Sequence, residues 1–136
     1  MRAWRCLASA IVVLIAVGAD AALAESATNP KSALVAELQD AVRTDEKNWL
    51  VAHMHFPVRY YGKSAKLIRS KTWFLQHYAT VIGPELKAKL IAQDPNDIFE
   101  NWQGIMVGEG SRNIWLRNFG ADTAPKYEII TINNSD

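Results

Sequence analysis

The chain has 136 residues, nearly balanced charge with 15 Lys and Arg against 14 Asp and Glu, and a single cysteine. A chain of this length forms one domain of ordinary size with one core. The lone cysteine, Cys6, excludes a disulfide framework and a thiolate metal site within the chain.

The first 24 residues have the pattern of a secretory signal peptide. Two arginines open the chain, residues 7–19 are apolar, and residues 22–24 form an A-x-A cleavage signal. Cleavage near Ala24 predicts a periplasmic or secreted protein that begins with a flexible tail over residues 25–31. The apolar run is shorter than the roughly 20 residues of a membrane helix, so we expect no stable membrane insertion. Export also argues against nucleic acid as a partner and against a cofactor loaded in the cytoplasm.

The single domain over residues 32–136 is expected to begin with two consecutive helices or one kinked helix. Apolar residues recur at spacings of three and four across residues 34–42, which predicts a helix capped by Asn29 or Ser32. We expect the second helical segment to end at Pro57, because the residue before a proline is disfavoured in the α region.

The remainder predicts strands and two further helices. Residues 58–68 favour two short strands around a turn, and the Gly83-Pro84 pair separates two helical patterns. Alternating apolar residues over 104–119 predict a hairpin, and residues 127–132 predict a final antiparallel strand. Helices first and a strand meander last indicate an α+β domain.

The charges are unevenly distributed along the chain. Residues 59–89 contain seven Lys or Arg and one acidic residue, Glu85. Two interpretations stay open. The basic residues pair with the more acidic ends after folding, or they attract an anionic partner such as a lipid headgroup, a cell-wall polymer or an acidic protein.

Four segments carry a resemblance to a known family, and they are HFPV at 55–58, TWFLQHY at 72–78, NWQGIMVG at 101–108 and IITIN at 129–133. They resemble small exported bacterial proteins of the nuclear transport factor two-like (SnoaL-like) cone-fold group. The resemblance implies a cystatin-like cone, with one long and two shorter helices packed on a curved antiparallel sheet, a pocket in the concavity, and dimerisation through the open sheet face. The group contains both enzymes and non-enzymes, so function must be argued from residues.

Catalysis has weak candidates in histidine and tyrosine. Isomerases of the group resemble a template with a carboxylate base in the pocket, but no Asp or Glu lies between Glu46 and Glu85, where that base would be carried. His53 or His77 is the remaining candidate base, with Tyr60 orienting a substrate. The three histidines have no metal-ligand spacing, so we predict no metal site and no cofactor.

The many aromatic residues are first interpreted as core. The alternative is an aromatic-lined cavity for a small apolar ligand, and its expected lining is Tyr60, Trp102, Met106 and Trp115.

Three functions stay open from the sequence. The first hypothesis is a non-catalytic binding module that holds a small apolar ligand or an envelope protein in the cone pocket or on the sheet face. The second is an enzyme of the isomerase or dehydratase kind that uses His and Tyr. The third is an immunity or inhibitor protein whose basic segment over residues 59–89 docks on an acidic partner. A homodimer is expected in addition.

Overall fold

The computed structural model describes residues 29–136, and the expected signal peptide over residues 1–24 lies outside the described residues. The tail expected over residues 25–31 cannot include residues 30 and 31, because the first helix begins at Pro30. The Asn29 side chain accepts a hydrogen bond from the backbone N–H of Lys31 at 3.0 Å, as a helix cap does. None of the helices within residues 29–136 is long and apolar enough to span a bilayer.

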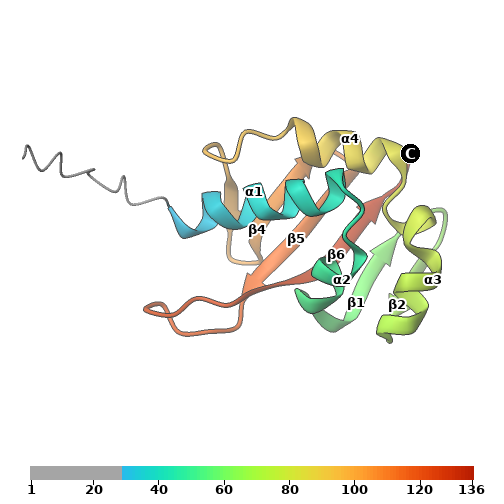
Figure 1. Cartoon of the computed structure of the whole chain (residues 1–136), viewed down its shortest axis with the longest axis horizontal. Helices are drawn as coiled ribbons and strands as arrows, with labels where there is room; N and C mark the ends of the chain where they lie inside the picture. Colours follow the sequence, from blue (N-terminus) through green and yellow to red (C-terminus); the bar gives the residue numbers. More distant parts are fainter. Residues whose placement is uncertain (1–28) are drawn as a thin grey trace, which may run out of the picture.

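The described residues form four helices and six strands, shown in Figure 1. The helices are α1 (Pro30–Arg43), α2 (Lys47–Ala52), α3 (Lys71–Val81) and α4 (Pro84–Ala92). The strands are β1 (Met54–Tyr61), β2 (Ala65–Ile68), β3 (Phe99–Asn101), β4 (Gly104–Glu109), β5 (Arg112–Asn118) and β6 (Tyr127–Asn134). The predicted α+β class is confirmed.

The six strands form one sheet in the order β2-β1-β6-β5-β4-β3. Neighbouring strands are antiparallel except for β1 and β6, which are parallel. The expectation of a wholly antiparallel sheet is therefore corrected to a mixed sheet. A parallel pair requires a long crossover connection, and here everything between β1 and β6 forms it.

Pro57 lies inside β1 instead of ending a helix, which corrects a second expectation. β1 has strands on both sides, where a proline would normally remove a ladder hydrogen bond. The pairing with β6 is irregular between Met54 and Arg59, and the pairing with β2 begins only at Val58. Pro57 therefore occupies a stretch of β1 in which no partner strand requires its missing N–H.

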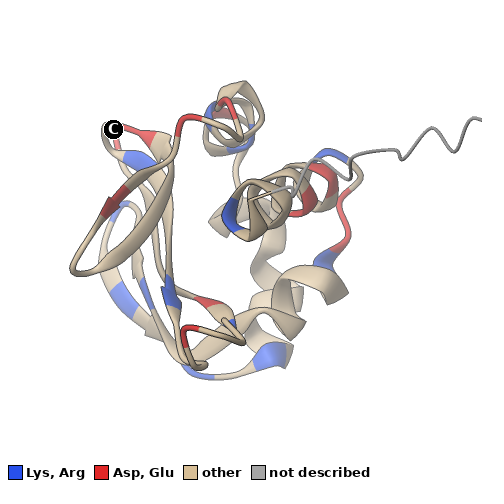
Figure 2. Cartoon of the chain, turned by 90° about the vertical axis from the view of Figure 1, so that its left-hand side faces the viewer, with Lys and Arg blue, Asp and Glu red and all other residues tan. Residues whose placement is uncertain are grey.

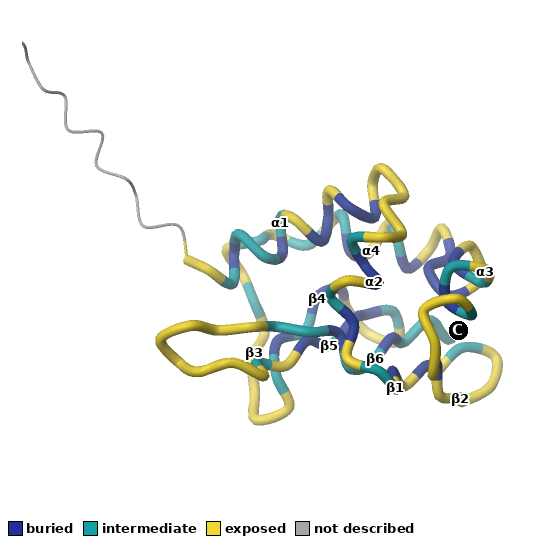
Figure 3. Tube along the Cα trace, turned by 60° about the horizontal axis from the view of Figure 1, so that its bottom comes forward, coloured by how far each residue is buried: buried dark blue, intermediate teal, exposed yellow. Residues whose placement is uncertain are grey.

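All four helices lie on one side of the sheet. Figure 2 shows strands on one side and helices on the other, and Figure 3 shows buried backbone where the two layers meet. The interior is filled by fully buried side chains from both layers, among them Leu38, Phe74, Leu86, Ile114 and Ile132. Burial of each such side chain contributes about 1.5–3 kcal/mol to folding.

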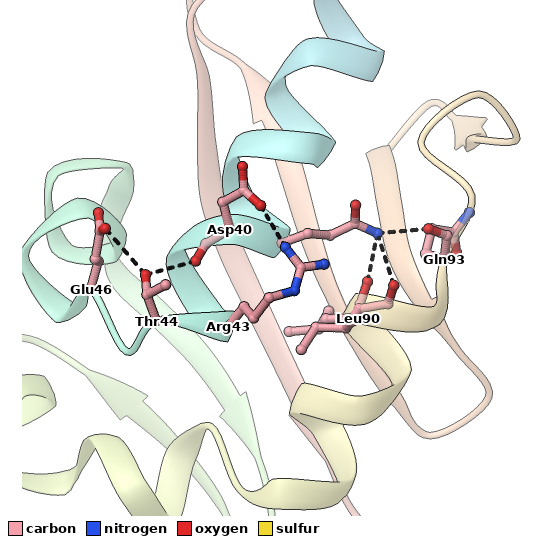
Figure 4. Close-up of polar contacts among 8 residues, drawn as sticks. Asp40, Arg43, Thr44, Glu46, Leu90 and Gln93 are labelled. Carbon is pink, nitrogen blue, oxygen red and sulfur yellow. Dashed lines mark hydrogen bonds and ion pairs between the residues drawn. The ribbon is translucent and has the colours of Figure 1, made fainter.

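A buried glutamine of α1 connects that helix to the end of α4. Nε2 of Gln39 donates to the carbonyl oxygens of Leu90 at 2.9 Å and Gln93 at 2.6 Å, contacts drawn in Figure 4. Carbonyls in the last turn of a helix have no partner within the helix. Gln39 therefore caps the carbonyl end of α4 from a neighbouring helix.

We expect Gln39→Leu to lower the free energy of unfolding by about 1–3 kcal/mol, because the change leaves buried carbonyls without a donor. The matched control is Gln76→Leu, the same change at an exposed position of α3, where the expected effect is under about 0.5 kcal/mol. Urea denaturation followed by circular dichroism measures both. Equal effects of the two changes would refute the cap.

Candidate functional site

His53 and His77 have the same arrangement, each stacked on a tryptophan four residues earlier. The ring centroids of Trp49 and His53 are 3.8 Å apart, and those of Trp73 and His77 are 4.0 Å apart. Nδ1 of each histidine contacts the carbonyl oxygen of its tryptophan, at 2.8 Å and 2.7 Å respectively. A carbonyl only accepts hydrogen bonds, so Nδ1 carries a proton in both rings. Each of the two histidine rings is therefore held by the tryptophan four residues before it.

His55 has separate partners on the opposite side of the sheet. It belongs to β1, its ring stacks on Phe119 at 3.9 Å, and its Nδ1 lies 2.8 Å from Oε2 of Glu128. Within residues 29–136, no cluster of His, Cys, Asp and Glu has the arrangement of a metal site.

The candidate catalytic residues are not brought together. The hydroxyl of Tyr60 donates to the carbonyl oxygen of Thr80 at 3.4 Å, and burial raises the pKa of this tyrosine. No hydrogen bond joins Tyr60 to His53 or His77 in the part of the chain that the structure describes.

The four residues expected to line one apolar pocket lie in three different places. Tyr60 is buried between the sheet and the helices, whereas Trp102 is 87% exposed at the turn between β3 and β4. Met106 and Trp115 are cross-strand partners. The residues beside them in sequence, such as Ile105 and Leu116, point into the core, so strand alternation directs Met106 and Trp115 to the uncovered face.

A largely apolar surface hollow of about 700 Å³ lies among α2, α3 and α4, and we call it the helix hollow. Its walls comprise Ala79, Ile82, Pro84, Ala88 and Ile91. Its rim is polar and comprises Asp45, Lys47, Tyr78 and Lys87.

The rim is organised around Asp45. One carboxylate oxygen of Asp45 accepts hydrogen bonds from the Tyr78 hydroxyl at 2.8 Å and from Nζ of Lys87 at 2.5 Å. The ammonium of Lys47 lies 5.2 Å from the centroid of the Tyr78 ring, within the range of a cation–π contact. Asp45 also has a φ of 55°, the only positive φ of a non-glycine residue within 29–136, and residues held in this region often mark functional sites.

The same contacts shift two pKa values. Hydrogen bonds from Lys87, and then from Tyr78, lower the pKa of Asp45. Burial, and then the hydrogen bond to Asp45, raise the pKa of Tyr78. At neutral pH the rim therefore holds an ionised carboxylate beside a protonated phenol, with two ammonium groups around them.

Little in the amino-acid sequence indicates this rim. Asp45 lies next to Thr44 in a segment that predicts a helix cap, and Tyr78 and Lys87 occupy positions on two other helices. The available signal was the tolerance of Asp for left-handed backbone between two helices. That signal indicates a turn and does not identify its partners.

A second, more polar hollow of about 630 Å³ lies where α1 begins, and its lining includes Lys31, Glu100, Trp102 and Tyr127. Lys31 and Glu100 form an ion pair at 2.5 Å, and the hydrogen bond to Glu100 raises the pKa of Lys31. Trp102 is thus placed beside charged groups, not in an apolar cavity.

The sheet face opposite the helices, which we call the open sheet face, carries large hydrophobic side chains. Tyr61, Leu67 and Phe99 are exposed. The Phe99 ring packs edge-on against Trp115, with centroids 6.1 Å apart. A shallow hollow of about 200 Å³ on this face is lined in part by Arg59, Tyr61 and Trp115.

The lowered pKa of Asp45 predicts a pH effect on stability. A carboxyl with a lowered folded-state pKa stabilises the fold above its ordinary pKa of 3.8, and this contribution is lost as the pH falls through the lower folded-state value. We therefore expect the stability advantage of the wild type over Asp45→Asn to shrink from about pH 6 to about pH 2. Urea denaturation across that range measures it. Asp97→Asn, at an exposed residue without an ion pair in the described chain, controls for the change in net charge. An advantage that stays constant with pH would count against an ionised Asp45 in the network.

Comparison of the chain with protein families, curated proteins and solved structures finds no match.

Proposed function

We propose that the chain is an exported, non-catalytic binding module of the nuclear transport factor two-like cone group, which acts in the periplasm or outside the cell. Its ligand is a small apolar molecule with an anionic head, held in the helix hollow. The observation that carries the proposal is the ordered, positively charged rim beside apolar walls.

The walls suit an apolar chain. The volume of about 700 Å³ falls within the range of about 300–1,000 Å³ that is common for ligand pockets. Each methylene group of a ligand that is buried there contributes about 0.8 kcal/mol. Burial in this hollow therefore supplies the main driving force for binding.

The rim suits an anionic head. The carboxylate of Asp45 is already engaged by Lys87 and Tyr78. Lys47 has no acidic partner within 4.0 Å among residues 29–136, so its ammonium is available to a ligand. Binding is favoured over general-base catalysis, because a carboxyl with a lowered pKa, such as Asp45, is a weak base.

Dodecanoate is a suitable probe, and isothermal titration calorimetry measures its affinity. Ala88→Trp fills the hollow from an exposed position of α4 and is expected to weaken binding at least about tenfold, or 1.4 kcal/mol. Ala92→Trp adds the same side chain to the same helix outside the hollow and should leave binding unchanged. Lys47→Ala is expected to weaken binding of dodecanoate but not of dodecan-1-ol. The proposal fails if the wild type does not bind dodecanoate or if the two tryptophan variants behave alike.

The open sheet face supports a second binding role, with a second copy of the chain as the partner. The longest strands, β1 and β6, have eight residues each. With strands about 4.8 Å apart and about 3.3 Å per residue, the face measures up to roughly 600 Å² in projection. A stable dimer buries about 800 Å² of accessible surface per partner, an area of the same order as that of this face.

Light scattering tests this role directly. We expect the wild type to have the mass of a dimer, and Tyr61→Lys, which places a charge on the exposed face, to have the mass of a monomer. Trp102→Lys is the control, because Trp102 is exposed at a turn and not on the face. A monomeric wild type at high concentration would exclude the role.

A further inference from the structure

Trp102 is the most exposed large hydrophobic residue within residues 29–136. Its side chain is 87% exposed, whereas tryptophan side chains are highly buried on average. It belongs to the lining of the hollow of about 630 Å³ where α1 begins, which we call the polar hollow. The helix hollow does not include this residue, so the proposed apolar ligand gives the exposed indole no role.

The backbone that carries Trp102 is fixed by contacts on both sides. Asn101 of β3 pairs with Gly104 of β4, so Trp102 and Gln103 form a two-residue turn. The backbone N–H of Gln103 donates to Oδ1 of Asn101 at 2.8 Å. Nε of Arg117 donates to the carbonyl oxygen of Gln103 at 3.2 Å. A turn held in this way presents its side chain with little of the entropy cost of ordering a loose loop.

The loop between β5 and β6, at the same end of the domain as the start of α1 (Figure 1), adds polar groups to the hollow. Oδ1 of Asn118 accepts from the backbone N–H groups of Gly120 at 2.8 Å and Lys126 at 2.9 Å, which orients the amide. Nδ2 of Asn118 has no hydrogen bond among the described residues. It is accessible to solvent, because the only buried side-chain nitrogen or oxygen without a partner there belongs to Arg112. Asp122 is exposed and has no ion pair within 29–136.

The charges around the polar hollow balance each other. Its lining contains two basic residues, Lys31 and Arg117, and two acidic residues, Glu100 and Asp122. Lys31 and Glu100 pair with each other at 2.5 Å. A phosphate or carboxylate would meet the two carboxylates, and an organic cation would meet the ammonium and the guanidinium, so either charge sign encounters repulsion. The hollow therefore favours a ligand that is polar but uncharged.

We infer that the polar hollow binds a neutral sugar. One face of a pyranose ring consists largely of C–H groups, which stack on the electron-rich face of an indole such as that of Trp102. The sugar hydroxyls donate to the Asp122 carboxylate and accept from Nδ2 of Asn118. The volume of about 630 Å³ lies within the range of about 300–1,000 Å³ that is common for ligand pockets. No residue lines both this hollow and the helix hollow, so either proposal can fail without the other.

Isothermal titration calorimetry with three neutral disaccharides, cellobiose, maltose and diacetylchitobiose, tests the site. We expect the wild type to bind at least one of them with a Kd below about 10 mM. The affinity should change less than about twofold between about 50 mM and about 500 mM NaCl, because the ligand carries no charge. Trp102→Ala is expected to weaken binding at least about tenfold, and Trp102→Phe, which keeps an aromatic ring, only about threefold.

A matched pair of substitutions tests the amide donor. Asn118→Asp keeps an oxygen that accepts from the loop and removes the Nδ2 donor, and we expect binding to weaken about threefold or more. Asn96→Asp adds the same charge at an exposed position outside the hollow, and we expect less than about a twofold change. A thermal melt of each variant checks that the fold is retained.

Three results would overturn the inference: no binding of any of the three disaccharides by the wild type, an unchanged affinity in Trp102→Ala, or equal losses in Asn118→Asp and Asn96→Asp. The last result would indicate a general effect of charge instead of a site. Sedimentation with insoluble chitin and cellulose distinguishes the source of the sugar. Sedimentation that Trp102→Ala abolishes identifies a polymer, whereas binding of a disaccharide alone identifies a free sugar.

Discussion

The helices cover only one face of the sheet, and this constraint determines where hollows form on the described domain. All four helices pack on that face, and the space between the two layers is filled by side chains such as Leu38, Phe74 and Ile132. Protein interiors of this kind are packed about as densely as organic crystals. The hollows therefore lie where helices meet each other or where they meet the ends of the sheet, and the opposite face retains its exposed hydrophobic residues.

Signals that act within a few residues predicted the elements well. Asn29 and Ser70 accept hydrogen bonds from the first turns of α1 and α3, and Pro84 begins α4 where proline fits the first helical turn. Strand alternation is also a signal that acts within a few residues, and it predicted β4, β5 and β6. The stacked pairs could also have been read from the sequence, because Trp49 and Trp73 each precede a histidine by four residues, the spacing that brings side chains together on a helix.

Contacts between distant segments were not predictable in this way. The parallel pairing of β1 with β6 joins the first and last strands, and no local pattern encodes it. Pro57 was predicted to end a helix, but it lies inside β1. A proline is tolerated there because the pairing with β2 begins only at Val58, and this register is not visible in the local sequence. The rim of the helix hollow has the same origin, since Asp45, Tyr78 and Lys87 meet only after three elements have packed. The residues of the predicted pocket lining lie apart, because strand alternation directs Tyr60 and Trp115 to opposite faces of the sheet.

The connection between α3 and α4 lies between two hollows of the surface. Ala79 and Pro84 line both the helix hollow and a hollow of about 480 Å³ beside the turn between β1 and β2. The connection is fixed from the sheet side, because Nδ2 of Asn134 donates to the carbonyl oxygen of Val81 at 3.3 Å. Asn134 also lies so close to Gly83 that an added Cβ would come within 3.1 Å of its amide nitrogen. This fixed connection therefore separates the largely apolar helix hollow from a second hollow that is lined by both basic and acidic residues.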